Sequence, residues 1–103
     1  MGEVERFSRI FEDAKNGGRH AGTYESSMSK TPSQLNKSIR SHEQQLAEHL
    51  NKINNPVLHS PDWGEISEMK RAGRVRYWQK EVDNLQDKLE IEKQVRKGRG
   101  ING

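Results

Sequence analysis

The chain has 103 residues, of which 29% are hydrophobic and 32% are charged, with a formal net charge of +3 at pH 7. A chain this short and polar is expected to form one small domain with a thin core. It has no cysteine, which excludes disulfides, thiolate metal sites and cysteine catalysis. No apolar run approaches the roughly 18 residues of a membrane span, so we expect no stable membrane insertion.

The first predicted element is a helix over residues 3–15, where apolar side chains recur at helical spacing and share one face. Asn16-Gly17-Gly18 predicts its end, because glycine tolerates the left-handed conformation that follows many helix C-termini. The pattern leaves open whether residues 1–16 are part of the functional domain or a connector helix to another segment.

Residues 18–30 show no clear period and are expected to form a flexible glycine-rich loop. Glycines flank Arg19 and His20, so the backbone can approach a phosphate closely while the guanidinium holds it through two hydrogen bonds. His20 would carry a proton, and Tyr24 would stack or donate a hydrogen bond. An ordinary flexible connector accounts for the same composition equally well.

The stretch from Thr31 to Pro56 predicts a well-defined helix. Thr31 suits the N-cap, Pro32 the first helical position, and Gln34 completes a capping box. An apolar stripe faces the expected core, beside a stripe of side chains that exchange protons or hydrogen bonds near neutral pH. The apolar stripe contains Leu35, Ile39, Leu46, Leu50 and Ile53, and the polar stripe contains Ser38, His42, Gln45, His49 and Lys52.

The polar stripe has two interpretations. His42 and His49 stand about 10 Å apart along a helix axis, too far for both to act on one atom. Either His42 is a polar substitute in the apolar seam with His49 a solvated neighbour, or a histidine works with His20 from the loop. Seven-residue spacing is not that of a helical metal pair, so we expect no metal and no other cofactor.

A third helix is expected to start at Ser60 or Asp62 and to reach about residue 95, with Gly73 dividing it. Its apolar positions alternate steps of three and four residues, a heptad-like seam. Residues 96–103 are expected to be a mobile, basic tail. With no strand pattern, the sequence predicts one all-α domain, a small bundle of three to four helices with residues 17–95 as its core. The seam consists of Val75, Trp78, Val82, Leu85 and Leu89.

The stretch MKRAGRVRYWQK, residues 69–80, interleaves basic and aromatic side chains. Such a pattern suits nucleic acid, because phosphates meet the charges and bases stack on the rings. Lys70, Arg74 and Arg76 are therefore candidates for contacts with a nucleic-acid backbone. A solvated basic face is an equally good interpretation, and Trp78 is expected to lie in the core.

The order of these segments resembles the C-terminal toxin regions of bacterial polymorphic toxins, found at the ends of contact-dependent inhibition, hemagglutinin-like and Rhs-type proteins. The resemblance covers residues 17–91, as NGGRHAGTY, KSIRSHEQQLAEHLNKINNP, a proline–tryptophan linker and YWQKEVDNLQDKLEI. There are two departures: the position of His42 is usually apolar in that class, and the linker here is shorter and lacks an aspartate–proline–arginine-like stretch. The most specific spacing is that of His20, Ser38, Glu43, Gln45, His49, Lys52 and Asn55-Pro56.

The resemblance implies an antibacterial effector, delivered as part of a larger secreted or cell-surface protein, acting in the target-cell cytoplasm and neutralised by a cognate immunity protein. Many such domains are nucleases. We expect a metal-independent ribonuclease acting on RNA such as tRNA, because the 2′-hydroxyl of RNA is a built-in nucleophile. The candidates for catalysis are His20, His49, Lys52 and Tyr24, and those for phosphate contact are Arg19 and Arg40.

Two other functions fit the same sequence. A non-catalytic helical module that binds protein or nucleic acid is favoured by the seam of the third helix and the thin core. A DNA-binding accessory protein would lose affinity steeply with salt and would tolerate replacement of His20 and His49.

Overall fold

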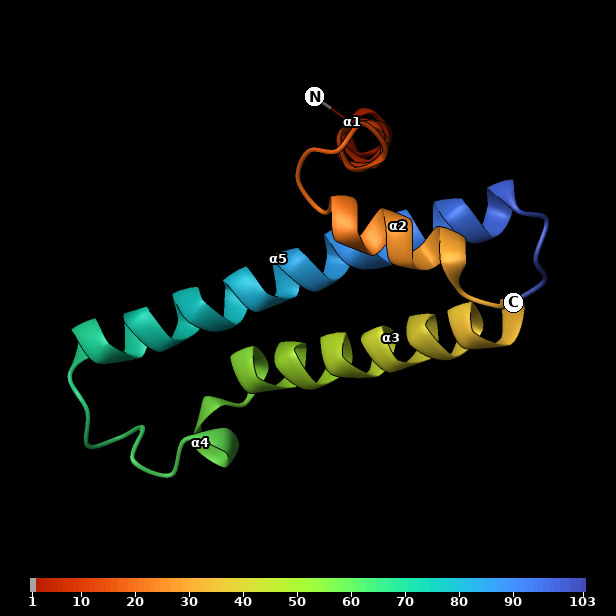
Figure 1. Ribbon diagram of the computed structural model, residues 1–103. Coiled ribbons are helices and arrows are strands. Elements are labelled where there is room, and N and C mark those ends of the chain that lie inside the picture. Colours follow the sequence, from red (N-terminus) through yellow and green to blue (C-terminus); the bar gives the residue numbers. More distant parts are fainter. Residues whose placement is uncertain (1) are drawn as a thin grey trace.

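Two long helices, α3 (Pro32–Asn54) and α5 (Glu68–Gly98), lie antiparallel and form the body of the molecule (Figure 1). The computed structural model describes residues 2–103, and of Glu3 and Val4 it describes only the backbone. The one-turn helix α4 (Pro56–His59) lies at the tip of the hairpin, whereas α1 (Glu3–Lys15) and α2 (Ala21–Ser29) pack at its other end (Figure 1). The described residues form five helices and no strand, which confirms the all-α prediction and exceeds the predicted number of helices.

The molecule is elongated, with extents of 50 × 30 × 22 Å. Its radius of gyration is 16.3 Å, whereas a compact chain of this length has about 13 Å. The shape follows from the small apolar fraction, because few side chains are available to cover the long hairpin. None of the helices in the described part of the chain is long and apolar enough to cross a membrane.

Helix α3 begins as predicted. The Gln34 backbone donates to the Thr31 hydroxyl at 3.2 Å, and the Thr31 backbone donates to the Gln34 side chain at 3.0 Å. This reciprocal capping box satisfies two donors that the first turn of a helix otherwise leaves unpaired. The helix ends at Asn54, two residues before the proline.

The end of α1 also follows the prediction. Gly17 adopts φ +84°, the left-handed conformation that terminates many helices. Gly18 must be glycine for a different reason: a Cβ atom there would lie 2.9 Å from the Asp13 carbonyl oxygen. The two glycines therefore let the chain reverse tightly from α1 into α2.

The prediction of a flexible loop over residues 18–30 is wrong, because Ala21–Ser29 form α2. Tertiary contacts compensate for the missing amphipathic pattern. Ser27 is buried and its hydroxyl donates to the Thr23 carbonyl at 2.7 Å, while Arg99 donates to the Ser27 carbonyl at 2.8 Å. The latter contact satisfies a carbonyl near the helix C-terminus, where a cation is favourable.

The predicted start and division of the third helix are wrong. Helix α5 begins at Glu68 with Ser67 as N-cap, and its 31 residues pass through Gly73 without a break. A glycine costs a helix about 1 kcal/mol, which the packing of the seam offsets. Trp78 is buried, as expected, and stacks on Trp63 with ring centroids 5.9 Å apart.

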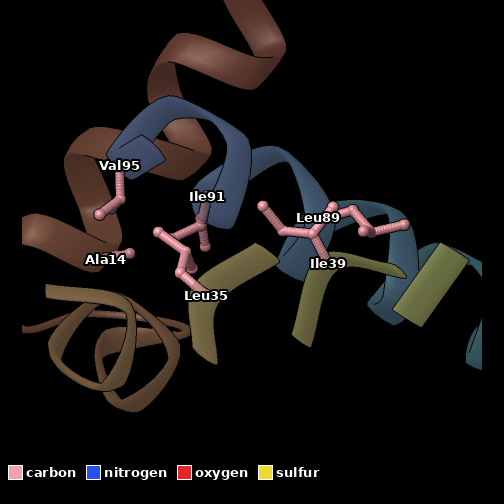
Figure 2. Packing of buried hydrophobic residues seen from close by; sticks show 6 residues of the cluster. All are labelled: Ala14, Leu35, Ile39, Leu89, Ile91 and Val95. Atoms are coloured by element: carbon pink, nitrogen blue, oxygen red, sulfur yellow. The ribbon is translucent and has the colours of Figure 1, made fainter. Parts of the chain in front are cut away.

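The core lies where α1, α3 and the C-terminal half of α5 meet (Figure 2). Leu35 and Ile39 of α3 interdigitate with apolar residues of α5, as the predicted stripe requires. The end of the chain also contacts this region: Ile101 packs against the core, and the Asn36 side chain donates to the Asn102 carbonyl at 2.9 Å. The buried apolar cluster consists of Ala14, Leu35, Ile39, Leu89, Ile91 and Val95.

Candidate active site

His20 occupies an unusual position at the N-terminus of α2. Its φ of 65° is left-handed, and within residues 2–103 it is the one non-glycine residue with positive φ. The Gly17-Gly18 turn imposes this geometry, with the Ala21 amide donating to the Gly18 carbonyl at 3.1 Å. Such a conformation costs a side chain about 1–2 kcal/mol, and strain of this kind concentrates at functional sites.

The strained backbone places the His20 ring beside Asp87 of α5. The Nε2 atom of His20 lies 3.5 Å from the Asp87 carboxylate, and the ring is only 11% exposed. The guanidinium groups of Arg6 and Arg19 approach the same carboxylate at 3.6 and 3.9 Å. Asp87 is therefore a buried carboxylate surrounded by groups from α1 and from the α1–α2 turn.

The charges in this cluster are close but not hydrogen-bonded. His20 Nε2 and Asp87 Oδ1 are both buried, and neither has a hydrogen-bond partner among the described residues. Buried polar atoms are nearly always satisfied in proteins. In free enzymes, however, catalytic hydrogen bonds are often long and shorten only when substrate binds. A shift of a few tenths of an ångström would close the bond between His20 and Asp87.

Arg19 is fixed at the rim of the site. Its guanidinium donates to the Asn84 side chain of α5 at 2.9 Å, although most of the Arg19 side chain is exposed. The group can therefore meet a ligand without losing its position against α5.

A cavity of about 240 Å³ opens beside this cluster. Three guanidinium groups border it, from Arg6, Arg9 and Arg19, together with the carboxylates of Asp13 and Asp87. The excess of positive charge suits an anion. The volume is below the roughly 300–1,000 Å³ of pockets for drug-sized ligands, so it fits a phosphate with part of a nucleotide rather than a large cofactor.

Burial lowers the pKa of His20 below its ordinary value of 6.5, and the positive charge of Arg19 lowers it further. The negative charge of Asp87 and its contact with the ring oppose this shift without reversing it. The imidazole is consequently neutral at pH 7, the form that can accept a proton.

The other predicted catalytic residues do not border this cavity. The Tyr24 ring packs edge-on against Phe11, with centroids 5.8 Å apart, and contributes to the core. His49 and Lys52 lie on α3, where His49 Nδ1 is buried without a hydrogen-bond partner among the described residues. Arg40 is exposed on the same helix. Of the predicted catalytic and phosphate-binding groups, the structure brings together Arg19 and His20.

The predicted nucleic-acid contacts lie in the first turns of α5. Arg74 donates to both carboxylate oxygens of Asp62 at 2.8 and 3.2 Å, and this hydrogen bonding lowers the pKa of Asp62. Lys70 and Arg76 are exposed. These residues are 11 to 17 positions from Asp87 along α5, or roughly 17–26 Å, so they cannot contact the same phosphate as Arg19.

Sequence reasoning missed Asp87, Arg6 and Arg9. All three lie on helices as charged residues, and spacing along one helix does not reveal that another helix covers them. No cluster of three or more metal-binding side chains occurs in the described part of the chain. No protein-family model matches this chain, and neither the curated proteins nor the solved structures contain a significant match. The resemblance to polymorphic toxins therefore stays a prediction.

Proposed function

We propose that this domain is a metal-independent ribonuclease whose catalytic base is His20. One observation carries the proposal: a strained and mostly buried histidine faces a carboxylate in a cavity bordered by three arginines. A histidine base and guanidinium groups around a phosphate suit cleavage of RNA, because RNA supplies its own nucleophile.

The reaction would begin with transfer of the 2′-hydroxyl proton to the neutral imidazole of His20. The 2′-oxygen then attacks the adjacent phosphorus, and the bond from phosphorus to the 5′-oxygen breaks, leaving a 2′,3′-cyclic phosphate. The departing 5′-oxygen takes a proton from water, and the resulting hydroxide is neutralised by the proton that His20 carries. Arg19 and Arg6 would stabilise the negative charge that builds up on the phosphoryl oxygens.

Asp87 would be a positioning residue. Its carboxylate faces Nε2 of His20, so Nδ1 would be the nitrogen that accepts the proton of the substrate. Once Nδ1 accepts a proton, the nearby carboxylate stabilises the imidazolium, as a carboxylate does for histidine in other enzymes.

The biological setting belongs to the same proposal. The resemblance supports an antibacterial effector domain that reaches its target cell as part of a larger protein and is held inactive in the producer by a cognate immunity protein. Expression with and without the neighbouring gene tests this setting: the domain alone is expected to stop growth, and the neighbour is expected to restore it. Growth unaffected by the domain would contradict the effector assignment.

The catalytic assignment is tested by incubating the purified domain with RNA in the presence of a chelator. Wild-type protein is expected to leave 2′,3′-cyclic phosphate ends. The cleavage rate of His20→Ala is expected to be about 10²–10⁴-fold lower than that of wild type. His59→Ala is the matched control, because His59 is exposed on α4. Equal loss in the two variants, or full activity of His20→Ala, would contradict the proposal.

Three further variants distinguish this site from the one expected from sequence. His49→Ala and Lys52→Gln are expected to retain near-wild-type cleavage, because neither residue borders the cavity at His20. Asp87→Asn is expected to lower the rate and to change the pH profile, since it removes the charge that faces the imidazole. Loss of stability alone would lower the rate of Asp87→Asn without changing the shape of that profile.

A non-catalytic binding module is the second candidate. It is favoured by large apolar side chains exposed at the tip of the hairpin, where Leu58 is 76% and Met69 81% exposed. Exposed apolar side chains in one region are typical of protein contacts. For this function, replacement of Leu58 and Met69 by serine would abolish binding to a partner, and His20→Ala would have no effect.

A further inference from the structure

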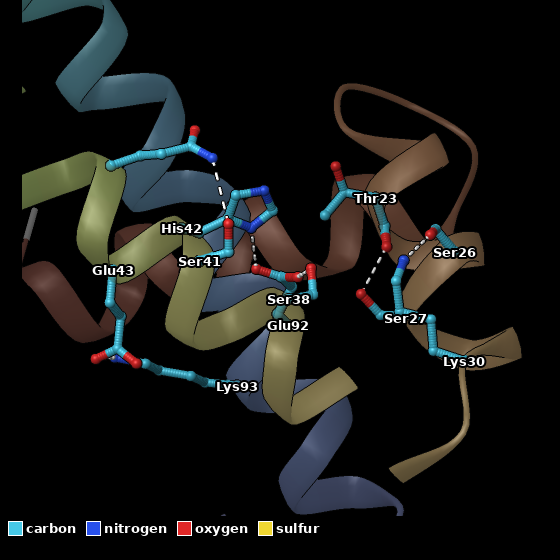
Figure 3. Close-up of polar contacts among 11 residues, drawn as sticks. Thr23, Ser26, Ser27, Lys30, Ser38, Ser41, His42, Glu43, Glu92 and Lys93 are labelled. Carbon is cyan, nitrogen blue, oxygen red and sulfur yellow. Dashed lines mark hydrogen bonds and ion pairs between the residues drawn. The ribbon is translucent and has the colours of Figure 1, made fainter. Parts of the chain in front are cut away.

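A second polar cluster lies on the other side of α2, centred on Glu92 of α5. Glu92 is only 2% exposed, yet both carboxylate oxygens have partners on α3 (Figure 3). The Ser38 hydroxyl donates to one oxygen at 2.5 Å, and His42 Nδ1 lies 2.6 Å from the other. Each oxygen of the buried carboxylate thus has a hydrogen-bond partner within the protein.

The contact with Glu92 also fixes the His42 ring. Because the carboxylate accepts a hydrogen bond from Nδ1, the remaining nitrogen, Nε2, is an acceptor in the neutral ring and donates to a phosphate only when the imidazole is protonated. His42 is 25% exposed, so this nitrogen is accessible from solvent. Figure 3 shows the hydroxyl-bearing side chains of α2 to one side of the His42–Glu92 pair.

A hollow of about 200 Å³ lies between these elements. Lys30 and Lys88 line it together with the His42–Glu92 pair, and the hydroxyl-bearing residues Thr23 and Ser26 line its α2 wall. Lys30 Nζ donates to the Ser26 hydroxyl, which directs the ammonium group along this wall. The hollow therefore combines two cations with hydroxyl donors, groups that proteins use to hold phosphate.

The two hollows are bordered by neighbouring residues at the start of α2 and on α5. His20 borders one and Gly22 the other, and on α5 the corresponding neighbours are Asp87 and Lys88. Gly22 is exposed, and a Cβ atom there would have no neighbour within 4 Å. The surface at Gly22 itself is therefore open to a chain that would pass from one hollow to the other.

From this juxtaposition we propose that the hollow lined by Lys30, His42 and Lys88 binds a phosphate adjacent to the scissile one, on the same single RNA strand. The inference rests on the proposed function, since it takes the ligand to be the RNA that His20 cleaves. Single strands are bound in this way by grooves whose cations follow the backbone from phosphate to phosphate. Substrates with more than one phosphodiester would accordingly be preferred.

The test is equilibrium binding of 2′-O-methyl oligonucleotides, which keep their phosphates but lack the nucleophile. The Lys30→Gln/Lys88→Gln variant is compared with Lys37→Gln/Lys97→Gln, which makes the same charge change at exposed lysines of α3 and α5. For a hexanucleotide we expect the first variant to bind about tenfold more weakly than the control. Its slope of log K against log salt should also be smaller by about 0.7, the value for one phosphate of a single strand.

The length of the ligand locates the phosphate. A ligand with one phosphodiester fills the hollow at His20, so the two variants should bind it with equal affinity. For ligands with two or more phosphates, the affinity of Lys30→Gln/Lys88→Gln should be lower than that of the control. An equal penalty with one phosphodiester, or equal binding of the two variants at every length, would overturn the inference. Circular dichroism of both variants checks that the helices are intact.

A substitution between the hollows gives an independent measurement. Gly22→Glu adds a carboxylate at an open position and should weaken binding of the longer ligands, whereas Gly22→Ala should bind like wild type. Equal binding by the two Gly22 variants would count against the path over α2. None of these ligands can be cleaved, so a domain that binds as described but cuts no RNA would refute the proposed function and leave the phosphate site standing.

Discussion

The two halves of α5 differ in which side chains are buried: one half buries carboxylates, and the other exposes apolar side chains. Near its C-terminus the helix buries the carboxylates of Asp87 and Glu92 beneath α1, α2 and α3, whereas near its N-terminus Met69 and Tyr77 are 81% and 63% exposed. At the C-terminal end of α5, helices α1 and α2 cover side chains that the α3–α5 hairpin alone would leave exposed. Burial of charge is costly, so the end that bears this cost is the better candidate for chemistry.

The exposed tip has a different character. Val57 and Leu58 of α4 and Met69 of α5 are exposed, whereas Trp78 is buried and its ring stacks on that of Trp63. Arg71 donates to the Trp63 carbonyl at 2.8 Å, and Arg74 pairs with Asp62, which fixes the turn that precedes α5. Two cations of the predicted nucleic-acid stretch, Arg71 and Arg74, are thus already engaged within the protein.

The largest difference between the two ends is expected in their contribution to stability. Ile91→Ala removes a fully buried side chain from the core and should lower the free energy of unfolding by about 2–5 kcal/mol. Leu58→Ala at the tip should change it by no more than about 0.5 kcal/mol. Urea denaturation followed by circular dichroism measures both values, and similar losses would show that the tip is covered in solution.

Replacement of a buried carboxylate should have the next largest effect. Glu92→Gln leaves one of the donors from Ser38 and His42 without a good acceptor and should cost about 1–3 kcal/mol. Glu65→Gln, at an exposed position before α5, should leave the denaturation midpoint unchanged. If Glu92→Gln is as stable as wild type, the cluster does not hold α3 and α5 in register.

A smaller effect is expected from pH. Burial lowers the pKa of His20 in the folded protein, whereas the unfolded chain titrates near 6.5. Its contribution to stability is therefore complete above pH 6.5 and is lost as the pH falls below that value toward the folded pKa. The melting temperature of wild type should fall more steeply from pH 7 to 5 than that of His20→Gln. Parallel curves would mean that His20 is not buried in solution.

The smallest effect is expected from the basic residues at the tip. Arg76→Gln removes an exposed cation far from His20 and should reduce the salt slope of oligonucleotide binding by about 0.7. Cleavage of a substrate with one phosphodiester should be unchanged, because that substrate is too short to reach the tip. Slower cleavage of the short substrate would indicate that the two ends of α5 act on the same phosphate.

Part of the candidate site could be inferred from the sequence. Arg19 and His20 were recognisable because two glycines precede them, and the structure places both in one cavity. Glu92 also left a signal: it continues the three-and-four spacing of the α5 seam after Leu89, as His42 does on α3 after Ile39. A carboxylate and a histidine at seam positions of two neighbouring helices suggest a buried pair. Asp87 left no such signal, because α1 and α2 cover its face of α5.

By itself, the sequence determined the all-α class, the capping box of α3, the end of α1 before Gly17 and the apolar stripes that join α3 to α5. These features depend on contacts within a few residues or on helical periodicity, both of which can be followed along the chain. Only the tertiary structure decided that residues 21–29 are helical, that α5 continues through Gly73, and that His20 lies beside Asp87 rather than His49. Each of these outcomes depends on burial between segments distant in sequence, whose packing free energy exceeds the local preferences of glycine and serine.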